Sequence, residues 1–164
     1  MATRDIRLWP DAVLTQDCAV VDLADRELPA LIADLFETMY SANGRGLAAP
    51  QIGVLQRVFV VDVTWKEGAH DPRIFINPNV VSVSEDSVLM DEQCLSIPDF
   101  PMPVYRPEEI VLSWTDAHGE AKTSKFDGIL ARCIQHELDH LNGKVIFDHQ
   151  TASARAELEA AYVA

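Results

Sequence analysis

The order of helical and extended segments constrains the fold of this chain more than any other feature. Two patterns typical of helices lie at residues 27–42 and 128–141. In the first, apolar side chains recur at every third or fourth position, which is the spacing of one helix face. Between the two helices lie extended runs at residues 57–63, 73–76, 80–83, 109–115 and 121–126. This order predicts an α+β fold with a largely antiparallel sheet.

Turn-forming residues separate these segments. Residues 77–79 (Asn-Pro-Asn) divide two of the extended runs, and residues 116–120 are typical of a hairpin turn between the last two. Four prolines between positions 98 and 107 keep that stretch extended and non-helical. A short helix is expected at 151–163. Because the 164 residues contain no repeat, linker or low-complexity tract, we expect a single domain over 1–164.

The charge and cysteine counts exclude several classes of protein. With 26 acidic and 13 basic residues, the net charge of −13 is unsuited to binding phosphate backbones or anionic membrane surfaces. No apolar stretch is long enough to span a membrane, and the first residues lack the apolar core of a secretion signal. Three cysteines without such a signal indicate a reducing compartment. We therefore expect a cytoplasmic protein with neither DNA nor a membrane as partner.

The segment at 136–140 (His-Glu-Leu-Asp-His) falls within the second predicted helix. Residues four positions apart on a helix lie about one turn along its axis and roughly 40° apart around it. His136 and His140 can therefore bind one metal ion from the same face, and Glu137 can hold its carboxylate near a metal-bound water. The same spacing also occurs in surface helices that bind no metal.

A catalytic metal site needs a third protein ligand and one open position. Ile146 occupies the position of the third histidine of metzincins, and His149 is out of register with it. A later helix could supply a carboxylate from Glu157 or Glu159, as in zincins of the glutamate type. An upstream thiolate from Cys94 is the other possibility. Spacing alone does not choose between these sources.

Three motifs, in order along the chain, resemble those of the peptide deformylases. Residues 44–51 (Gly-Arg-Gly-Leu-Ala-Ala-Pro-Gln) look like the family's G-x-G-x-A-A-P-Q, and residues 92–96 (Glu-Gln-Cys-Leu-Ser) look like its E-G-C-x-S. Residues 135–140 (Gln-His-Glu-Leu-Asp-His) look like its Q-H-E-x-D-H. The resemblance covers almost the full length. It implies antiparallel sheets packed around a metal-ligand helix, and a hydrolase that removes formate from N-formylmethionyl peptides.

The resemblance also implies the metal site. Cys94, His136 and His140 would bind one divalent ion, which would be Fe(II) in the cell, with Zn(II), Ni(II) or Co(II) able to replace it. A thiolate with two imidazoles suits these ions and disfavours Mg(II) and Ca(II). The ion would lower the pKa of a bound water, so that hydroxide could attack the formyl carbonyl near neutral pH.

The catalytic roles follow from the same resemblance. The side-chain amide of Gln51 and the backbone N–H of Leu95 would stabilise the charge that develops on the carbonyl oxygen. Glu137 would take the water proton and pass it to the leaving amine. Gln135 and Asp139 flank the histidines and could orient them, although Asp139 could equally pair with a nearby arginine.

Three residues depart from the family pattern. Arg45 and Arg132 stand where the family has apolar residues, and Gln93 stands where it has glycine. Because an unpaired buried charge is costly, Arg132 would either make the first-residue pocket narrower and more polar or reach outward to water. The residues we expect to contact the peptide are Arg45, Gly46, Gln93, Arg106, Arg132 and Cys133.

The C-terminal tail carries Arg155 beside Glu157 and Glu159, which argues against docking onto ribosomal RNA. Two alternatives to an ordinary deformylase follow from the sequence. One is a zincin-type metallopeptidase in which Glu157 is the third ligand. The other is a deformylase-like binding protein, or an accessory deformylase whose first-residue preference has changed.

Overall fold

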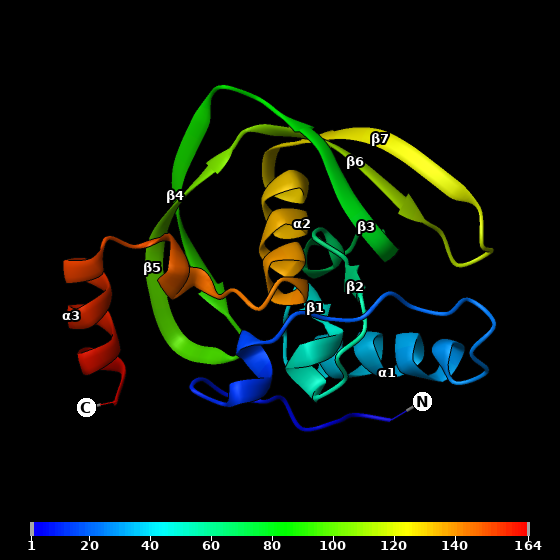
Figure 1. The fold of residues 1–164 in the computed structure, drawn as a ribbon, viewed down its shortest axis with the longest axis horizontal. Coiled ribbons are helices and arrows are strands. Elements are labelled where there is room, and N and C mark those ends of the chain that lie inside the picture. The colour runs from blue at the N-terminus through cyan, green and yellow to red at the C-terminus, as the bar shows by residue number, and fades with distance from the viewer. Residues whose placement is uncertain (1, 164) are drawn as a thin grey trace.

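The fold is known from a computed structural model, which describes residues 2–163. Helix α2 (Gly128–Leu141) lies at the centre of the molecule in Figure 1, between a five-stranded sheet and a separate two-stranded ribbon. Helix α1 (Leu28–Ser41) covers the lower side in this view, and α3 (Ala152–Val163) lies outside the ribbon.

Each pair of neighbouring strands in the five-stranded sheet runs antiparallel, in the order β1-β2-β3-β6-β7. The α+β class with antiparallel sheets is therefore confirmed, and so is the predicted hairpin, in which Thr115 faces Ala121 across the turn. The strands are β1 (Gly46–Ala48), β2 (Val58–Val61), β3 (Arg73–Val83), β6 (Glu109–Thr115) and β7 (Ala121–Asp127).

The predicted break at residues 77–79 is wrong, because β3 continues through it as one strand. The pairing with β6 shifts register between Ile76 and Asn79, and Asn77 takes a positive φ of 49°. Two hydrogen bonds hold Asn77 in this conformation. Its side chain accepts one from the backbone N of Val21 and donates one to the backbone carbonyl oxygen of Val21. A bulge therefore absorbs the turn-forming residues without ending the strand.

The ribbon consists of β4 (Ser87–Cys94) and β5 (Ile97–Pro107). The proline-rich stretch is extended and non-helical as expected, but its pairing with β4 was not predicted. The first five residues of β4 are exposed, so they lack the alternation of buried and exposed residues that indicates a strand. Prolines are tolerated because β5 has one neighbouring strand within residues 2–163, which leaves its other edge free of ladder hydrogen bonds.

The three predicted helices all form, with ends within one residue of those expected. Helix α2 ends at Asn142 and Gly143, where Gly143 has a φ of 72°. Four short 3-10 turns connect the other elements: η1 (Ala12–Thr15), η2 (Ala49–Ile52), η3 (Trp65–Glu67) and η4 (Ile146–His149).

The two faces of helix α2 carry different kinds of side chain. Its apolar residues Ala131, Ile134, Leu138 and Leu141 pack into a core cluster with aromatic side chains of the large sheet. The opposite face carries the histidine pair toward the ribbon. Among residues 2–163, no helix combines the length and apolar character needed to cross a bilayer.

Candidate metal centre

The ribbon delivers Cys94 to the histidine face of α2. Cys94 is the last residue of β4, and the pairing with β5 shifts register between Glu92 and Cys94. Glu92 and Cys94 are both buried, whereas Gln93 between them is exposed and lines a cleft beside the site. The strand end therefore turns two functional side chains toward α2 and one toward the cleft.

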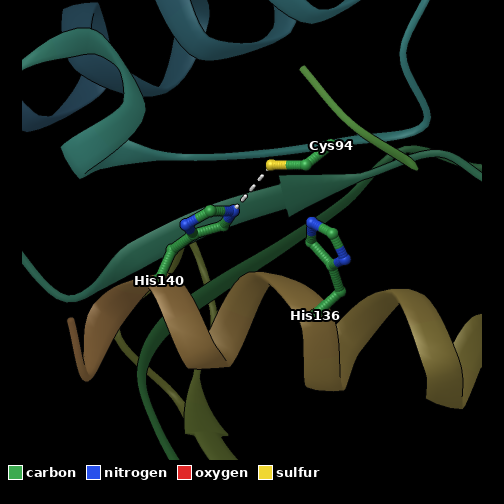
Figure 2. Close-up of side chains that lie close together, drawn as sticks. All are labelled: Cys94, His136 and His140. Carbon is green, nitrogen blue, oxygen red and sulfur yellow. Dashed lines mark hydrogen bonds between the residues drawn. The ribbon is translucent and has the colours of Figure 1, made fainter. Parts of the chain in front are cut away.

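Cys94, His136 and His140 converge, as Figure 2 shows. The Sγ of Cys94 lies 3.4 Å from the Nε2 of His140, and one ligand atom from each of the three residues lies within 4.8 Å of the others. This is the group of potential metal ligands that the described part of the chain brings together. Glu157 is on α3, beyond the ribbon in Figure 1, so it is Cys94 and not Glu157 that the fold brings to the two histidines.

The chemistry of these side chains fits a divalent transition-metal ion. Burial alone would raise the pKa of Cys94, but the charges and hydrogen bonds of His140 and His136 hold that pKa well below its ordinary value. This direction favours the thiolate, which is the metal-binding form of cysteine. A soft thiolate with two imidazoles suits Fe(II), Zn(II), Ni(II) or Co(II).

An unpaired carboxylate oxygen of Glu137 also fits a bound ion and its solvent. Within residues 2–163, the Oε1 of Glu137 and the Nδ1 of His140 have no hydrogen-bond partner. Buried polar atoms are almost always satisfied, so a carboxylate oxygen left unpaired beside three potential ligands indicates a site that takes up a further group.

Glu92 orients one of the ligands, a role that the sequence reasoning missed. Its Oε1 lies 2.9 Å from the Nδ1 of His136. The pKa of Glu92 is far below its ordinary value, because hydrogen bonds and charges from His136 and Arg106 outweigh the opposing effect of burial. An ionised carboxylate only accepts, so Nδ1 carries the proton and Nε2 is left to bind metal. The motif position of Glu92, two residues before Cys94, was the available signal.

Arg106 was expected to contact the peptide, but the structure places it elsewhere. Its side chain is 3% exposed and does not belong to the described cleft lining. The guanidinium donates two hydrogen bonds to Glu92, at 2.6 and 2.9 Å, and one to Asp139, at 2.9 Å. Asp139 thus pairs with an arginine, which was one of the two roles considered for it. Gln135 does not orient a histidine in the described structure; it donates to the carbonyl oxygen of Pro107.

Arg132 turns toward the ribbon, and its side chain is 11% exposed. Its guanidinium donates to the carboxylate of Glu92 and to the backbone carbonyl oxygens of Val88 and Val104. Arg132 therefore does not reach outward to water, which was one of the two arrangements considered for it. Arg132 nevertheless belongs to the cleft lining, so its effect on substrate choice stays a prediction.

Gln51 lies beside the ligands with a fixed orientation. The backbone N of Ala48 donates to its Oε1 at 3.0 Å, which turns the amide Nε2 inward. That nitrogen lies 3.1 Å from the Oγ of Ser96 and 3.7 Å from the Sγ of Cys94. Leu95, in the turn after Cys94, lines the same cleft. Gln51 and Leu95, the two residues expected to supply oxyanion donors, thus both line the cleft, and their roles stay a prediction.

Glu137 and Gly46 meet where the cleft reaches the ligands. Burial raises the pKa of Glu137, partly offset by the charges of His136 and His140. A Cβ at Gly46 would lie 2.5 Å from Glu137 Oε2 and 2.8 Å from the Sγ of Cys133, so any larger residue at this position would displace one of these groups. The thiol of Cys133 donates to the carbonyl oxygen of Arg45, and burial raises its pKa well above the ordinary value.

The cleft has a volume of about 610 Å³, and its lining includes five of the six residues expected to contact the peptide. Arg45 forms an exposed ion pair with Glu67 at 3.0 Å, so its head group lies at the rim. The five residues are Arg45, Gly46, Gln93, Arg132 and Cys133.

Comparisons with known proteins agree on one family. The family model described as "Polypeptide deformylase" matches residues 3–156. A peptide deformylase of Agrobacterium fabrum is 42% identical over 149 residues, covering 91% of this chain and 88% of that protein. One of Rhizorhabdus wittichii is 45% identical over 154 residues, covering 91% and 87%. The structure of an Ehrlichia chaffeensis peptide deformylase in complex with actinonin matches with a TM-score of 0.91 at 36% identity, covering 98% of this chain and 96% of that one.

Proposed function

Because the chain belongs to the polypeptide deformylase family, we propose that it is a metal-dependent hydrolase acting on N-formylmethionyl peptides. The reaction breaks the amide bond between the formyl carbon and the peptide nitrogen, and water supplies the new oxygen. The products are formate and a peptide with a free N-terminus. The convergence of Cys94, His136 and His140 is the observation that carries this proposal.

We propose that these three residues hold one divalent ion. When bound, the ion supplies Lewis acidity that makes a water molecule reactive near neutral pH. Glu92 keeps His136 in the tautomer that can bind metal, and the low pKa of Cys94 keeps the thiolate available. The donor set accepts several ions, so Fe(II) in the cell stays a prediction.

Three groups of the chain act on the substrate in this proposal. The Nε2 of Gln51, held inward by Ala48, donates to the formyl oxygen as negative charge develops on it. The backbone N–H of Leu95 is the second donor. Glu137 accepts the water proton and returns it to the leaving amine, a role suited to a buried carboxyl group with a raised pKa. Gly46 permits close approach of the peptide backbone beside Glu137.

Anaerobic purification with elemental analysis, followed by formate release from formyl-Met-Ala-Ser, tests the proposal. We expect about one metal ion per chain and release of formate. Cys94→Ala should lose both, because one of the three ligands is removed. Cys18→Ala is the matched control, since Cys18 lies in the core cluster, and it should keep both. Metal-loaded wild-type protein that releases no formate would instead support the deformylase-like binding protein.

The effect of Arg132 on substrate choice needs a separate comparison. We propose that its guanidinium makes the cleft floor beside Cys133 narrower and more polar. Formyl peptides with small or acidic first residues should then be hydrolysed faster than formyl-Met peptides. Equal or faster turnover of formyl-Met peptides would refute this altered preference and leave the deformylase activity unaffected.

We also keep two expectations about the protein's surroundings as proposals. In the tail, Arg155 is paired with Asp148 at 2.8 Å and Glu159 at 3.4 Å, so its charge is not free for RNA. We expect no salt-sensitive cosedimentation with ribosomes. Three cysteines outside disulfides are consistent with a cytoplasmic protein.

A further inference from the structure

The ligands of the metal centre come from two elements that are held together by side chains. His136 and His140 are on α2, whereas Cys94 ends a ribbon whose strands pair with each other and not with the described large sheet. Backbone hydrogen bonds from Ser84 N to Glu109 O (2.9 Å) and from Glu108 N to Asp86 O (3.0 Å) tie the outer end of the ribbon to the large sheet, but among residues 2–163 none joins β4 or β5 to α2. The distance between thiolate and imidazoles depends on the contacts that join the two elements.

Arg132 makes several of these contacts at once, beyond a single ion pair. It lies one helical turn before His136, and from there its guanidinium reaches the carboxylate of Glu92. The same group donates to the backbone carbonyl oxygens of Val88 on β4 and Val104 on β5, the latter at 3.1 Å. One side chain thus joins the helix to both strands of the ribbon. It also binds the carboxylate that orients His136.

We propose that Arg132 is a positioning residue for the metal centre. By holding both strands of the ribbon on α2, it sets the separation between Cys94 and the two histidines before any ion binds. This inference rests on the proposed metal site but not on the identity of the substrate.

The composition of the cluster explains why an arginine can be accommodated here. Two guanidinium groups, from Arg106 and Arg132, face two carboxylates, from Glu92 and Asp139, so the buried charges balance. Arginine also presents donors in a fixed plane that can reach several acceptors at once. A lysine at the same position has a single head group and could not bridge all three acceptors with the same geometry.

Metal affinity measured by chelator competition tests the proposal without relying on activity. Zn(II) dissociation constants are compared for wild type, Arg132→Met and Arg132→Lys. Methionine keeps an unbranched side chain but removes every donor. Loss of a group that orients metal ligands typically weakens affinity about 10–100-fold. We expect a loss of that size for Arg132→Met and a smaller one for Arg132→Lys.

Arg155→Met is the matched control, because Arg155 also pairs with carboxylates but lies on α3, away from the site. It should bind Zn(II) as tightly as wild type. An unchanged affinity in Arg132→Met would overturn the proposal, even if its melting temperature falls, because the role would then be structural only. If Arg132→Met does not fold, unchanged affinity in Arg132→Lys overturns it equally.

The outcomes also separate this inference from the proposed function. Wild-type protein that binds no Zn(II) would overturn both. Wild-type protein that binds Zn(II) and releases no formate, with weakened binding in Arg132→Met, would refute the deformylase activity and support the positioning role.

Discussion

At the scale of single residues, Glu137 shows how burial adapts a carboxyl group to proton transfer. Its Oε1 has no hydrogen-bond partner within residues 2–163. Its Oε2 lies so close to Gly46 that a Cβ on that residue would be only 2.5 Å away. Burial raises its pKa, so protonated and ionised forms lie closer in free energy than in water. Such a group can accept a proton in one step and return it in the next.

Replacing Glu137 by Gln should therefore slow catalysis strongly while leaving the three metal ligands intact. We expect formate release to fall about 10²–10⁴-fold, which is the usual contribution of general acid–base catalysis. The metal content should be unchanged, because Cys94, His136 and His140 remain. Steady-state kinetics and elemental analysis on the same preparation measure both.

Glu157→Gln provides the control for this experiment. A zincin-type site with Glu157 as ligand predicts that this variant loses its metal. Our account predicts wild-type metal content and activity, since Glu157 lies on α3 outside the ligand group. Metal loss on substitution of Glu157 would contradict the choice of Cys94 as third ligand.

At the scale of elements, the candidate metal centre lies where helix α2, the end of the ribbon and the start of strand β1 meet. Each contributes through its local geometry: α2 by its helical spacing, β4 by a register shift before Cys94, and β1 by the absence of a Cβ at Gly46. Small shifts between these elements should therefore affect chemistry more than stability.

Gly46→Ala tests this dependence directly. The new Cβ would lie 2.5 Å from Glu137 Oε2, so either the carboxylate or the loop must move. We expect kcat/KM for formate release to fall by up to about 10²-fold, since misplacements near 1 Å have effects of that size. Metal content should be retained.

Gly44→Ala is the comparison two residues away. Its Cβ would meet the Cδ1 of Leu95 at 2.6 Å, and the end of a leucine side chain can rotate away. A much smaller loss is expected. Equal losses in the two variants would show that the loop backbone, and not the contact with Glu137, is responsible.

Local patterns predicted some of these elements and not others. The apolar spacing of residues 27–42 and the stop signals at Asn142 and Gly143 located both long helices within one residue. The β4–β5 ribbon was not recognised as a pair, because the first five residues of β4 are all exposed and the prolines of β5 are unfavourable in strands. Asn77 was taken as a strand break because its stabilising contact with Val21 is 56 residues away in the sequence.

Local patterns likewise predicted some residues of the candidate site and not others. Spacing on one helix found His136 and His140, and the family motifs identified Cys94, which spacing could not choose over Glu157. The Glu92–Arg106–Asp139 ion pairs and the turn of Arg132 toward the ribbon depend on long-range packing. Arg106 was therefore expected in the cleft, whereas the structure places its guanidinium between the carboxylates of Glu92 and Asp139.

At the scale of the whole molecule, the N-terminal segment and the two sheet systems close around α2 (Figure 1). Cys18 illustrates this closure: its backbone N donates to the carbonyl oxygen of Leu141 at 2.9 Å, and its side chain joins the main core cluster. Burial raises the pKa of the Cys18 thiol to about 11, with a partly opposing effect of Arg57.

The stability of the fold should therefore decrease in alkaline solution partly through Cys18. Its pKa is higher in the folded than in the unfolded chain, so the unfolded chain loses the proton first as the pH rises. This contribution to stability is complete below the unfolded pKa, near 9, and is lost as the pH approaches about 11. Denaturant unfolding between pH 8 and 11 should show a shallower decline in Cys18→Ala than in wild type. Parallel declines would contradict it.

The account as a whole depends on a thiolate and two imidazoles binding the same ion. X-ray absorption at the zinc edge of the zinc-loaded protein measures that coordination directly. We predict one sulfur at about 2.3 Å and two imidazole nitrogens at about 2.0–2.1 Å, with an oxygen in the remaining position. A first shell without sulfur, or one whose sulfur persists in Cys94→Ala, would contradict the account.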